Sequence, residues 1–237
     1  MTRPKALVLL SGGMDSVTLA YFASKQYDVR LALSFNYGQR HKKELDFARE
    51  HAARLGAEHR IIDLSHLCDL LKGSSLTQDD IIVPDGHYAE ETMKATVVPN
   101  RNAMMLSIAY AAGISGGYSA LFTAVHAGDH FIYPDCRPEF ISALDTALEI
   151  GNAGFNPQGL KIMAPFVNMT KAEIASTAHS LGVPLESTWS CYKGAALHCG
   201  TCGTCHERQE ALWLAGVPDK TVYESPLTQF MTEERKA

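Results

Sequence analysis

Short apolar runs alternate with longer stretches of helical periodicity through most of the chain. The apolar runs have the length and composition of strands that are buried on both faces, as in parallel sheets. They predict strands at residues 7–10, 29–35, 59–64, 119–125 and 161–166. The periodic stretches predict helices at residues 15–25, 44–55, 103–112, 138–150 and from 171 onward. Strand and helix in this alternation predict right-handed crossovers and a doubly wound, mainly parallel five-stranded sheet of the α/β class.

Polar residues mark the starts of several of these helices. Asp15 or Ser16 is expected to cap the first helix, and Asn102 the alanine-rich helix that ends near Gly113. Thr170 followed by Glu173 has the spacing of a capping box.

The chain is long enough for one full core and a small appendage. It has 237 residues, of which 46% are hydrophobic. We expect an α/β domain over residues 1–185, with a surface excursion at 66–95, and a small C-terminal helical lobe over residues 186–237.

The first predicted strand ends in the run Ser11-Gly12-Gly13-Met14-Asp15-Ser16. Glycines at a strand end that leads into a helix gather unpaired N–H groups at the positive end of the helix dipole, which favours phosphate. The run has neither the lysine of a Walker loop nor the third glycine of the dinucleotide fingerprint. A turn that binds nothing is the alternative.

Residues 126–137 form a second polar segment, directly after the fourth predicted strand. Parallel sheets build their binding sites at the carboxyl ends of strands, so this segment is a candidate for the same site. A solvated polar loop is the alternative.

Four of the six cysteines lie close together near the C-terminus, at Cys191, Cys199, Cys202 and Cys205. Two successive Cys-x2-Cys steps can wrap their sulfurs around one ion, and four thiolates would close a structural zinc site. An iron–sulfur cluster is the alternative for this spacing. The remaining Cys68 and Cys136 are interpreted as plain thiols.

Charge and hydropathy narrow the classes of partner. The formal net charge is −5 and the sequence pI about 6.0, and the one dense basic cluster is Arg40-His41-Lys42-Lys43, which favours a small-molecule substrate over nucleic acid. No apolar run has the length of a membrane helix and no signal-peptide pattern opens the chain. We therefore expect a cytoplasmic protein whose cysteines are thiols or metal ligands.

The combination of motifs resembles one enzyme family. It comprises the loop at 11–16, Val98-Pro99-Asn100-Arg101-Asn102, Tyr133-Pro134-Asp135-Cys136-Arg137, Thr170-Lys171-x-Glu173-Ile174 and the four cysteines. The loop alone resembles the pyrophosphate loop of the N-type ATP pyrophosphatase (PP-loop) superfamily. The whole set, from about residue 5 to 215, resembles the 7-cyano-7-deazaguanine synthases. Met14 stands where many members carry glutamine.

The resemblance implies an adenine nucleotide alpha hydrolase-like fold and an ATP-dependent carbon–nitrogen ligase of queuosine biosynthesis. Such an enzyme converts 7-carboxy-7-deazaguanine and free ammonia into 7-cyano-7-deazaguanine, through an adenylated carboxylate and an amide. It also implies ATP, Mg²⁺ and one structural Zn²⁺ per chain, a homodimer, and no nucleic-acid or membrane partner.

The family resemblance assigns roles to particular residues. The implied catalytic residues are Asp15, Arg101, Asp135 and Lys171. The implied nucleotide-binding residues are Leu10, Ser11, Gly12, Gly13, Met14, Asp15, Ser16, Val17, Thr18, Leu19 and Ala20. The implied substrate-binding residues are Tyr37, Arg101, Asn102, Asp129, Tyr133, Asp135 and Arg137. The implied zinc ligands are Cys191, Cys199, Cys202 and Cys205.

Two other functions use the same motifs. A tRNA-modifying PP-loop enzyme of the thiolation or lysidine type would carry the same loop, with a basic surface for RNA. A zinc-stabilised protein that binds ATP without turnover is the second alternative.

Overall fold

A computed structural model describes residues 2–78, 80–89 and 93–227 of the chain. The last part of the expected C-terminal lobe, residues 228–237, lies outside the described residues.

The centre of the molecule is a five-stranded sheet in the order β3-β2-β1-β4-β5, and every neighbouring pair is parallel. The strands are β1 (Lys5–Leu9), β2 (Asp28–Asn36), β3 (Glu58–Asp63), β4 (Ala120–Phe122) and β5 (Lys161–Met163). The expected doubly wound parallel sheet is confirmed. The last two strands are shorter than the sequence pattern predicts, because the apolar residues after each strand turn away into loops.

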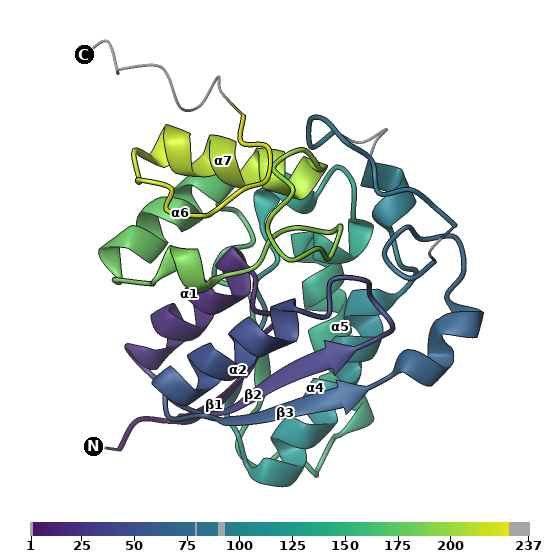
Figure 1. Cartoon of the computed structure of the whole chain (residues 1–237). Coiled ribbons are helices and arrows are strands. Elements are labelled where there is room, and N and C mark those ends of the chain that lie inside the picture. The colour runs from purple at the N-terminus through teal and green to yellow at the C-terminus, as the bar shows by residue number, and fades with distance from the viewer. Residues whose placement is uncertain (1, 79, 90–92, 228–237) are drawn as a thin grey trace.

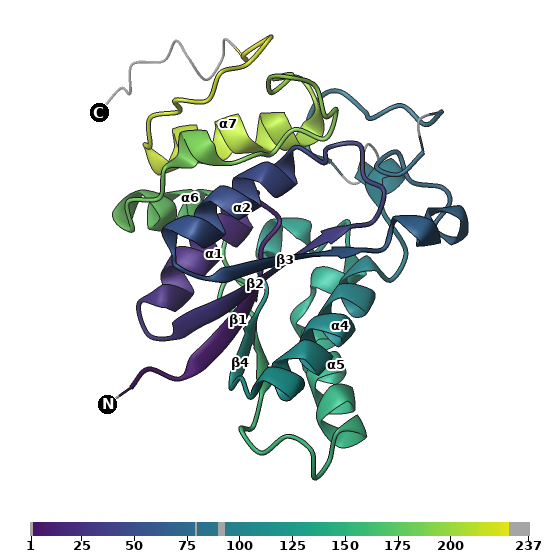
Figure 2. The same cartoon turned by 60° about the horizontal axis from the view of Figure 1, so that its bottom comes forward.

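Helices cover both faces of the sheet. They are α1 (Met14–Ser24), α2 (Glu44–Arg54), α4 (Arg101–Gly116), α5 (Pro138–Gly151), α6 (Lys171–Ser180) and α7 (Gly203–Ala215). Short 3-10 helices occupy Ser65–Leu70, Lys94–Thr96, Ala127–Asp129, Pro134–Cys136 and Leu185–Ser187. Figure 2 shows α1, α2, α6 and α7 on one side of the sheet and α4 and α5 on the other. None of the described helices is long and apolar enough to cross a membrane.

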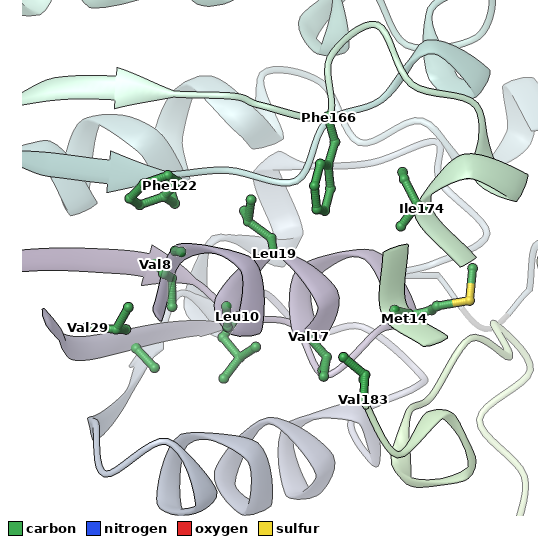
Figure 3. Close-up of a cluster of buried hydrophobic side chains, with 14 of the residues drawn as sticks. Val8, Leu10, Met14, Val17, Leu19, Val29, Phe122, Phe166, Ile174 and Val183 are labelled. Atoms are coloured by element: carbon green, nitrogen blue, oxygen red, sulfur yellow. The ribbon is translucent and has the colours of Figure 1, made fainter. Parts of the chain in front are cut away.

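The two faces of the sheet support separate hydrophobic clusters. On one face, Val8, Phe122 and α1 residues such as Leu19 pack with Phe166 and Ile174 (Figure 3). Leu212 of α7 and the following Val217 belong to the same cluster. Helix α7 is therefore joined to the layer that holds α1 and α6, and it lies against α6 in Figure 1.

The helix starts differ from the sequence prediction in two places. Gly13, with no side-chain hydrogen bond, precedes α1, so neither Asp15 nor Ser16 caps it. Asn102 lies inside the first turn of α4, whose N-cap residue is Asn100 at φ 56°. Asp135 supplies the missing acceptor, because its Oδ2 accepts a hydrogen bond from the Asn102 N–H at 3.2 Å.

Gly113 does not end its helix, contrary to the sequence prediction. The helix α4 continues to Gly116 and is closed by Gly117 at φ 66°. Gly113 lies where α4 crosses the sheet, and a Cβ there would stand 2.6 Å from Leu160 Cδ2. By contrast, the capping box of Thr170 and Glu173 at the start of α6 is confirmed.

Because Leu160 and Leu7 are fully buried beside Gly113, we predict that Gly113→Ala lowers the free energy of unfolding by about 1–3 kcal/mol through overpacking. The control is Gly151→Ala in α5, where a Cβ would meet nothing within 4 Å; it should be neutral or stabilising by up to about 1 kcal/mol. Chemical denaturation of the three proteins measures both effects. If Gly113→Ala is as stable as the control, the side chains of Leu7 and Leu160 move aside without a loss in the free energy of unfolding.

Candidate functional site

A cavity of about 240 Å³ opens at the carboxyl ends of the central strands, where β1 and β4 lie side by side. The chain leaves these two strands toward opposite faces of the sheet, which makes this the topological switch point of the fold. The turn after β1, the loop after β4, the first turns of α4 and α6, and α7 all contribute to its wall.

The turn after β1 is held by its own serines. Ser16 Oγ accepts a hydrogen bond from the Ser11 N–H at 3.2 Å and donates one to the Gly13 carbonyl at 3.1 Å. Gly12 has φ 88°, and a Cβ at that position would stand 2.1 Å from the carbonyl oxygen of Glu44. Gly12 is thus required by the close approach of α2, as well as by the turn.

A cluster of charged side chains follows this turn inside the cavity. Lys171 Nζ lies 2.5 Å from Asp15 Oδ2 and 3.3 Å from Glu207 Oε2. His126 Nε2 lies 3.4 Å from Asp129 Oδ2 and 3.7 Å from Asp15 Oδ2. The other oxygen of Asp15, Oδ1, is buried and has no hydrogen-bond partner among the described residues.

Burial and neighbouring charges shift the pKa values of Asp15, Lys171 and Glu207. Burial raises the pKa of Asp15, but the charges of Lys171 and His126 outweigh burial and the net shift is downward. Burial likewise lowers the pKa of the lysine. The carboxylates of Asp15, Glu207 and Asp129 outweigh that effect, so the pKa of Lys171 lies above its ordinary range. Burial raises the pKa of Glu207. The ion pair of Asp15 and Lys171 therefore stays charged over the physiological range.

The other end of the cavity is aromatic and contains one guanidinium. Arg101 Nη1 donates to the Tyr37 hydroxyl at 3.3 Å, and the guanidinium lies over the Tyr37 ring, 5.7 Å from its centroid. Among the described residues no carboxylate forms an ion pair with Arg101. Tyr192 also lines this end, where its ring lies 5.0 Å from that of His41. An unpaired guanidinium beside aromatic rings is a site for a planar ligand with an anionic group.

Glu44 is a buried carboxyl group in the same wall. Its Oε1 accepts a hydrogen bond from Gln39 Nε2 at 3.0 Å and lies 3.5 Å from His41 Nε2. Burial raises the pKa of Glu44 from its usual 4.5 to about 8, and burial lowers the pKa of His41 to about 3. Both side chains are therefore largely uncharged near neutral pH.

The structure divides the expected nucleotide-binding residues between cavity and core. Leu10, Ser11, Gly13, Met14, Asp15 and Ser16 line the cavity. Val17, Thr18, Leu19 and Ala20 lie in the buried interior of α1 instead. Gly12 lies in the same turn, between Ser11 and Gly13.

The expected substrate-binding residues divide in a similar way. Tyr37, Arg101, Asn102 and Asp129 line the cavity, as does Lys171. Three others lie behind its wall. The Tyr133 hydroxyl is hydrogen-bonded to Thr96 Oγ1 at 2.5 Å. Asp135 holds the start of α4, and Arg137 Nε donates to the His130 carbonyl at 2.8 Å.

Sequence reasoning missed Glu44, His126, Tyr192 and Glu207 as wall residues or members of the charged cluster. His126 stands in the polar segment that the sequence singled out, so position after a strand could have identified it. Glu44 begins helix α2, and Glu207 follows the cysteine run. No local sequence pattern marks either residue as part of the site.

The four C-terminal cysteines come together as expected. Their sulfur atoms lie within 4.8 Å of one another, all four residues are buried, and they form no disulfide. The N–H groups of Cys202 and Thr201 point to Cys199 Sγ at 3.3 and 3.4 Å, which favours the thiolate form of that sulfur. The four residues could hold a metal ion. Four thiolates around one zinc would stand ~3.8 Å apart, given a Zn–S distance of ~2.3 Å.

The cysteine segment also contacts the loop after β1. The Trp189 N–H donates to the Gly12 carbonyl at 2.9 Å, and the Trp189 indole N–H donates to the Cys191 carbonyl at 2.8 Å. These two hydrogen bonds of Trp189 connect the cysteine site to the turn beside the cavity.

A parallel sheet in this order, with a Ser-Gly-Gly-x-Asp-Ser turn at its switch point, defines an ATP-dependent enzyme of the PP-loop superfamily. The model of the family described as "Queuosine biosynthesis protein QueC" matches residues 5–216. The chain belongs to this family of queuosine biosynthesis.

Named relatives agree with the family. The chain is 53% identical over 234 residues to a 7-cyano-7-deazaguanine synthase of Brucella ovis, covering 98% of this chain and 100% of the relative. It is 55% identical over 220 residues to one of Brucella anthropi, covering 93% and 94% of the two chains. A solved 4-thiouridine synthetase–RNA complex with bound ATP has the same fold, with a TM-score of 0.52, 17% identity, and coverage of 96% of this chain and 50% of that one.

We predict a pH dependence of stability that arises from Glu44. Between its unfolded pKa and the folded value of about 8, the folded protein keeps a proton that the unfolded chain has lost. The contribution of Glu44 to the free energy of unfolding therefore falls as the pH rises, by up to about 1.4 kcal/mol per pH unit. Glu44→Gln removes this term, so the variant should gain stability relative to the wild type from pH 5.5 to 7.5.

Denaturant unfolding at several pH values measures the difference. Glu50→Gln is the control, because Glu50 lies on the exposed side of α2 in an ion pair with Arg54. A constant difference between Glu44→Gln and the wild type across this window would contradict a proton held on Glu44.

Proposed function

We propose that this enzyme converts 7-carboxy-7-deazaguanine, ammonia and ATP into 7-cyano-7-deazaguanine. The observation that carries the proposal is the cavity, in which the phosphate-type loop and the unpaired Arg101 guanidinium form parts of one wall. The first element suits a nucleoside triphosphate and the second suits a carboxylate on a flat ring system. The named relatives match nearly the whole chain, and their names support the same substrate.

The reaction needs two activations of one carbon. The substrate carboxylate oxygen attacks the α-phosphorus of ATP, which forms an acyl-adenylate and releases pyrophosphate. Ammonia displaces AMP and gives the amide. The amide oxygen is then adenylated by a second ATP, and loss of AMP and a proton leaves the nitrile. Each activation separates a highly charged leaving group, so the enzyme must stabilise pyrophosphate twice in each turnover.

We infer that the turn after β1 performs that task. The turn leads directly into the start of α1, where the helix dipole adds positive potential. Ser11 and Ser16 add hydroxyl groups, and Lys171 adds a positive charge next to the turn. These groups would bind the β- and γ-phosphates and hold the leaving pyrophosphate.

The charged cluster has the donors that Mg²⁺ requires. The Oδ1 atom of Asp15 is buried without a partner among the described residues, and the carboxylates of Asp129 and Glu207 belong to the same cluster. We propose that Asp15, with these neighbours, holds the ion. Bound Mg²⁺ would neutralise part of the phosphate charge.

Arg101 is proposed to bind the substrate carboxylate before activation. Tyr37 and Asn102 line the same cavity and would contact the ring system and its polar edge. Asp135 acts through α4: it accepts from the first turn of the helix that carries Arg101. We assign Asp135, Tyr133 and Arg137 to positioning this wall, because their side chains form hydrogen bonds to protein groups behind it.

We propose that the four cysteines bind one structural Zn²⁺. The close grouping of their sulfurs, within 4.8 Å, suits a single ion. An iron–sulfur cube would hold four irons between the sulfurs and would require them to stand much further apart. Four thiolates leave zinc no open position, so it would hold the C-terminal segment without taking part in the reaction.

We propose four further features of the protein. No second active site for glutamine hydrolysis is evident in the described part of the chain, so free ammonia is the proposed nitrogen source. The exposed side chains of Ile150 and Phe155 offer an apolar surface for a homodimer.

The cytoplasm is the proposed location of the protein. The proposed division of the chain is an α/β domain over residues 1–185 and a C-terminal lobe over residues 186–237.

The proposed reaction is tested by incubating the protein with ATP, Mg²⁺, ammonium and 7-carboxy-7-deazaguanine. We expect mass spectrometry to show 7-cyano-7-deazaguanine, with two AMP and two pyrophosphate per nitrile, because both activations take place at the α-phosphorus. In the same assay, Arg101→Ala should raise the KM for the deazapurine about 10-fold or more, with less effect on the KM for ATP.

Any other outcome of this assay contradicts one step of the proposed reaction. ADP with phosphate would exclude attack at the α-phosphorus. Absence of base conversion by folded protein would exclude the synthase activity, and modification of tRNA would then favour the thiolation-type alternative. Arg49→Ala is the control for Arg101→Ala, since Arg49 is an exposed partner of Asp46 on α2.

We predict that Cys202→Ser loses the proposed zinc and is less stable than the wild type. Removal of one thiolate leaves the other three with an incomplete and charged site, so plasma emission spectroscopy should find one zinc fewer per chain. Thermal unfolding should begin at a lower temperature. Cys68→Ser is the matched control, because Cys68 lies far from this cluster in the sequence and donates to the Tyr37 carbonyl. Equal metal content in both variants would contradict the site.

A further inference from the structure

A second group of metal-ligand residues lies where α7 meets the segment that contains His87. His206 and Glu210 stand four residues apart on this helix, so their side chains share one face. His87 comes from the long excursion between β3 and α4, and its ring lies 4.3 Å from the His206 ring. Each of the three side chains offers a ligand atom, and these atoms lie within 4.8 Å of one another.

The three residues have the donors of a transition-metal site. Two imidazoles and one carboxylate are the ligand set of three-ligand zinc sites, which keep a fourth position for water. His206 is buried, Glu210 is half-buried and His87 is exposed, so an ion could enter from solvent and keep a bound water. The four thiolates form a separate and complete set.

The backbone before His87 is already fixed against the cysteine segment. Asp85 and Cys202 form an isolated antiparallel bridge, and the Gly86 N–H donates to the Thr201 carbonyl at 2.9 Å. The Asp85 carboxylate lies 2.5 Å from Lys193 Nζ. His87 is therefore presented to α7 by a preorganised turn, which lowers the entropy that an ion would have to overcome.

The residue after His87 reaches the active-site cavity. The Tyr88 hydroxyl donates to Asp129 Oδ1 at 2.6 Å, inside the charged cluster around His126. Figures 1 and 2 both show the blue excursion passing beside the N-terminal end of α7. A link between His87 and α7 would thus hold the segment that places Tyr88 on Asp129.

We propose that His87, His206 and Glu210 form a second divalent-metal site, for Zn²⁺ or a chemically similar first-row ion. The ion joins the excursion to α7 beside the active-site cavity. By fixing His87, it steadies the hydrogen bond from Tyr88 to Asp129. This site is independent of the proposed reaction and of the four-cysteine site.

The test uses full-length protein, dialysed against Zn²⁺ and then against metal-free buffer. We expect wild-type protein to hold one more zinc per chain than His87→Ala or Glu210→Gln. Calorimetric titration with Zn²⁺ should show about 100-fold weaker binding at this site in both variants, because each loses a direct ligand. His66→Ala, which removes another exposed histidine, should behave as the wild type.

Two spectroscopic readouts separate this site from the cysteines. In protein loaded with Co²⁺, sulfur-to-cobalt charge transfer reports the thiolate site and should be unchanged by His87→Ala. Amide hydrogen exchange of residues 83–89 should slow when Zn²⁺ fills the second site in the wild type, and not in His87→Ala. Equal zinc content and affinity in wild type and His87→Ala would overturn the site. Binding without slower exchange would overturn its role as a link.

Discussion

The ion pair between Lys171 and Asp15 is the interaction on which the site depends. Only 17% of the Lys171 side chain is exposed, so its charge must be balanced by protein groups. Asp15 comes from the start of α1, and Glu207 balances the same charge from α7. Three segments that are distant in sequence are therefore tied to one ammonium group, and this group lies beside the turn that would hold phosphate. If it were removed, several carboxylates would remain together with much less positive charge to balance them.

The same logic explains the other wall of the cavity. Arg101 occupies the first turn of α4, where a positive side chain opposes the helix dipole. Asp135 compensates by accepting from the N–H of the neighbouring Asn102. The guanidinium can thus face the cavity without a carboxylate of its own, which leaves its charge for a ligand. Lys171 and Arg101 both stand at helix starts, but among the described residues only the lysine forms ion pairs with carboxylates.

The sequence predicts the sheet, the turn after β1 and the cysteine cluster because each depends on local pattern. Buried strands leave apolar runs, the turn requires adjacent glycines, and paired Cys-x2-Cys steps place sulfurs together. Glu44 and Glu207 could not be found in this way, since their roles come from burial and from partners far along the chain. The same holds for Gly113, whose local preference suggests a break but whose packing against Leu160 keeps it inside a helix.

The cysteine segment brings the four sulfurs together, and it also positions groups that belong to the cavity. Trp189, two residues before the first cysteine, donates to the Gly12 carbonyl, and Glu207, two residues after the last, contacts Lys171. A metal bound between those cysteines would fix the spacing of these two contacts. Because Gly12 is also held against the Glu44 carbonyl of α2, the turn is clamped from two sides. A structural ion remote from the chemistry would therefore control how accurately the turn and the lysine are placed, and loss of that ion would loosen the anion site before it unfolded the sheet.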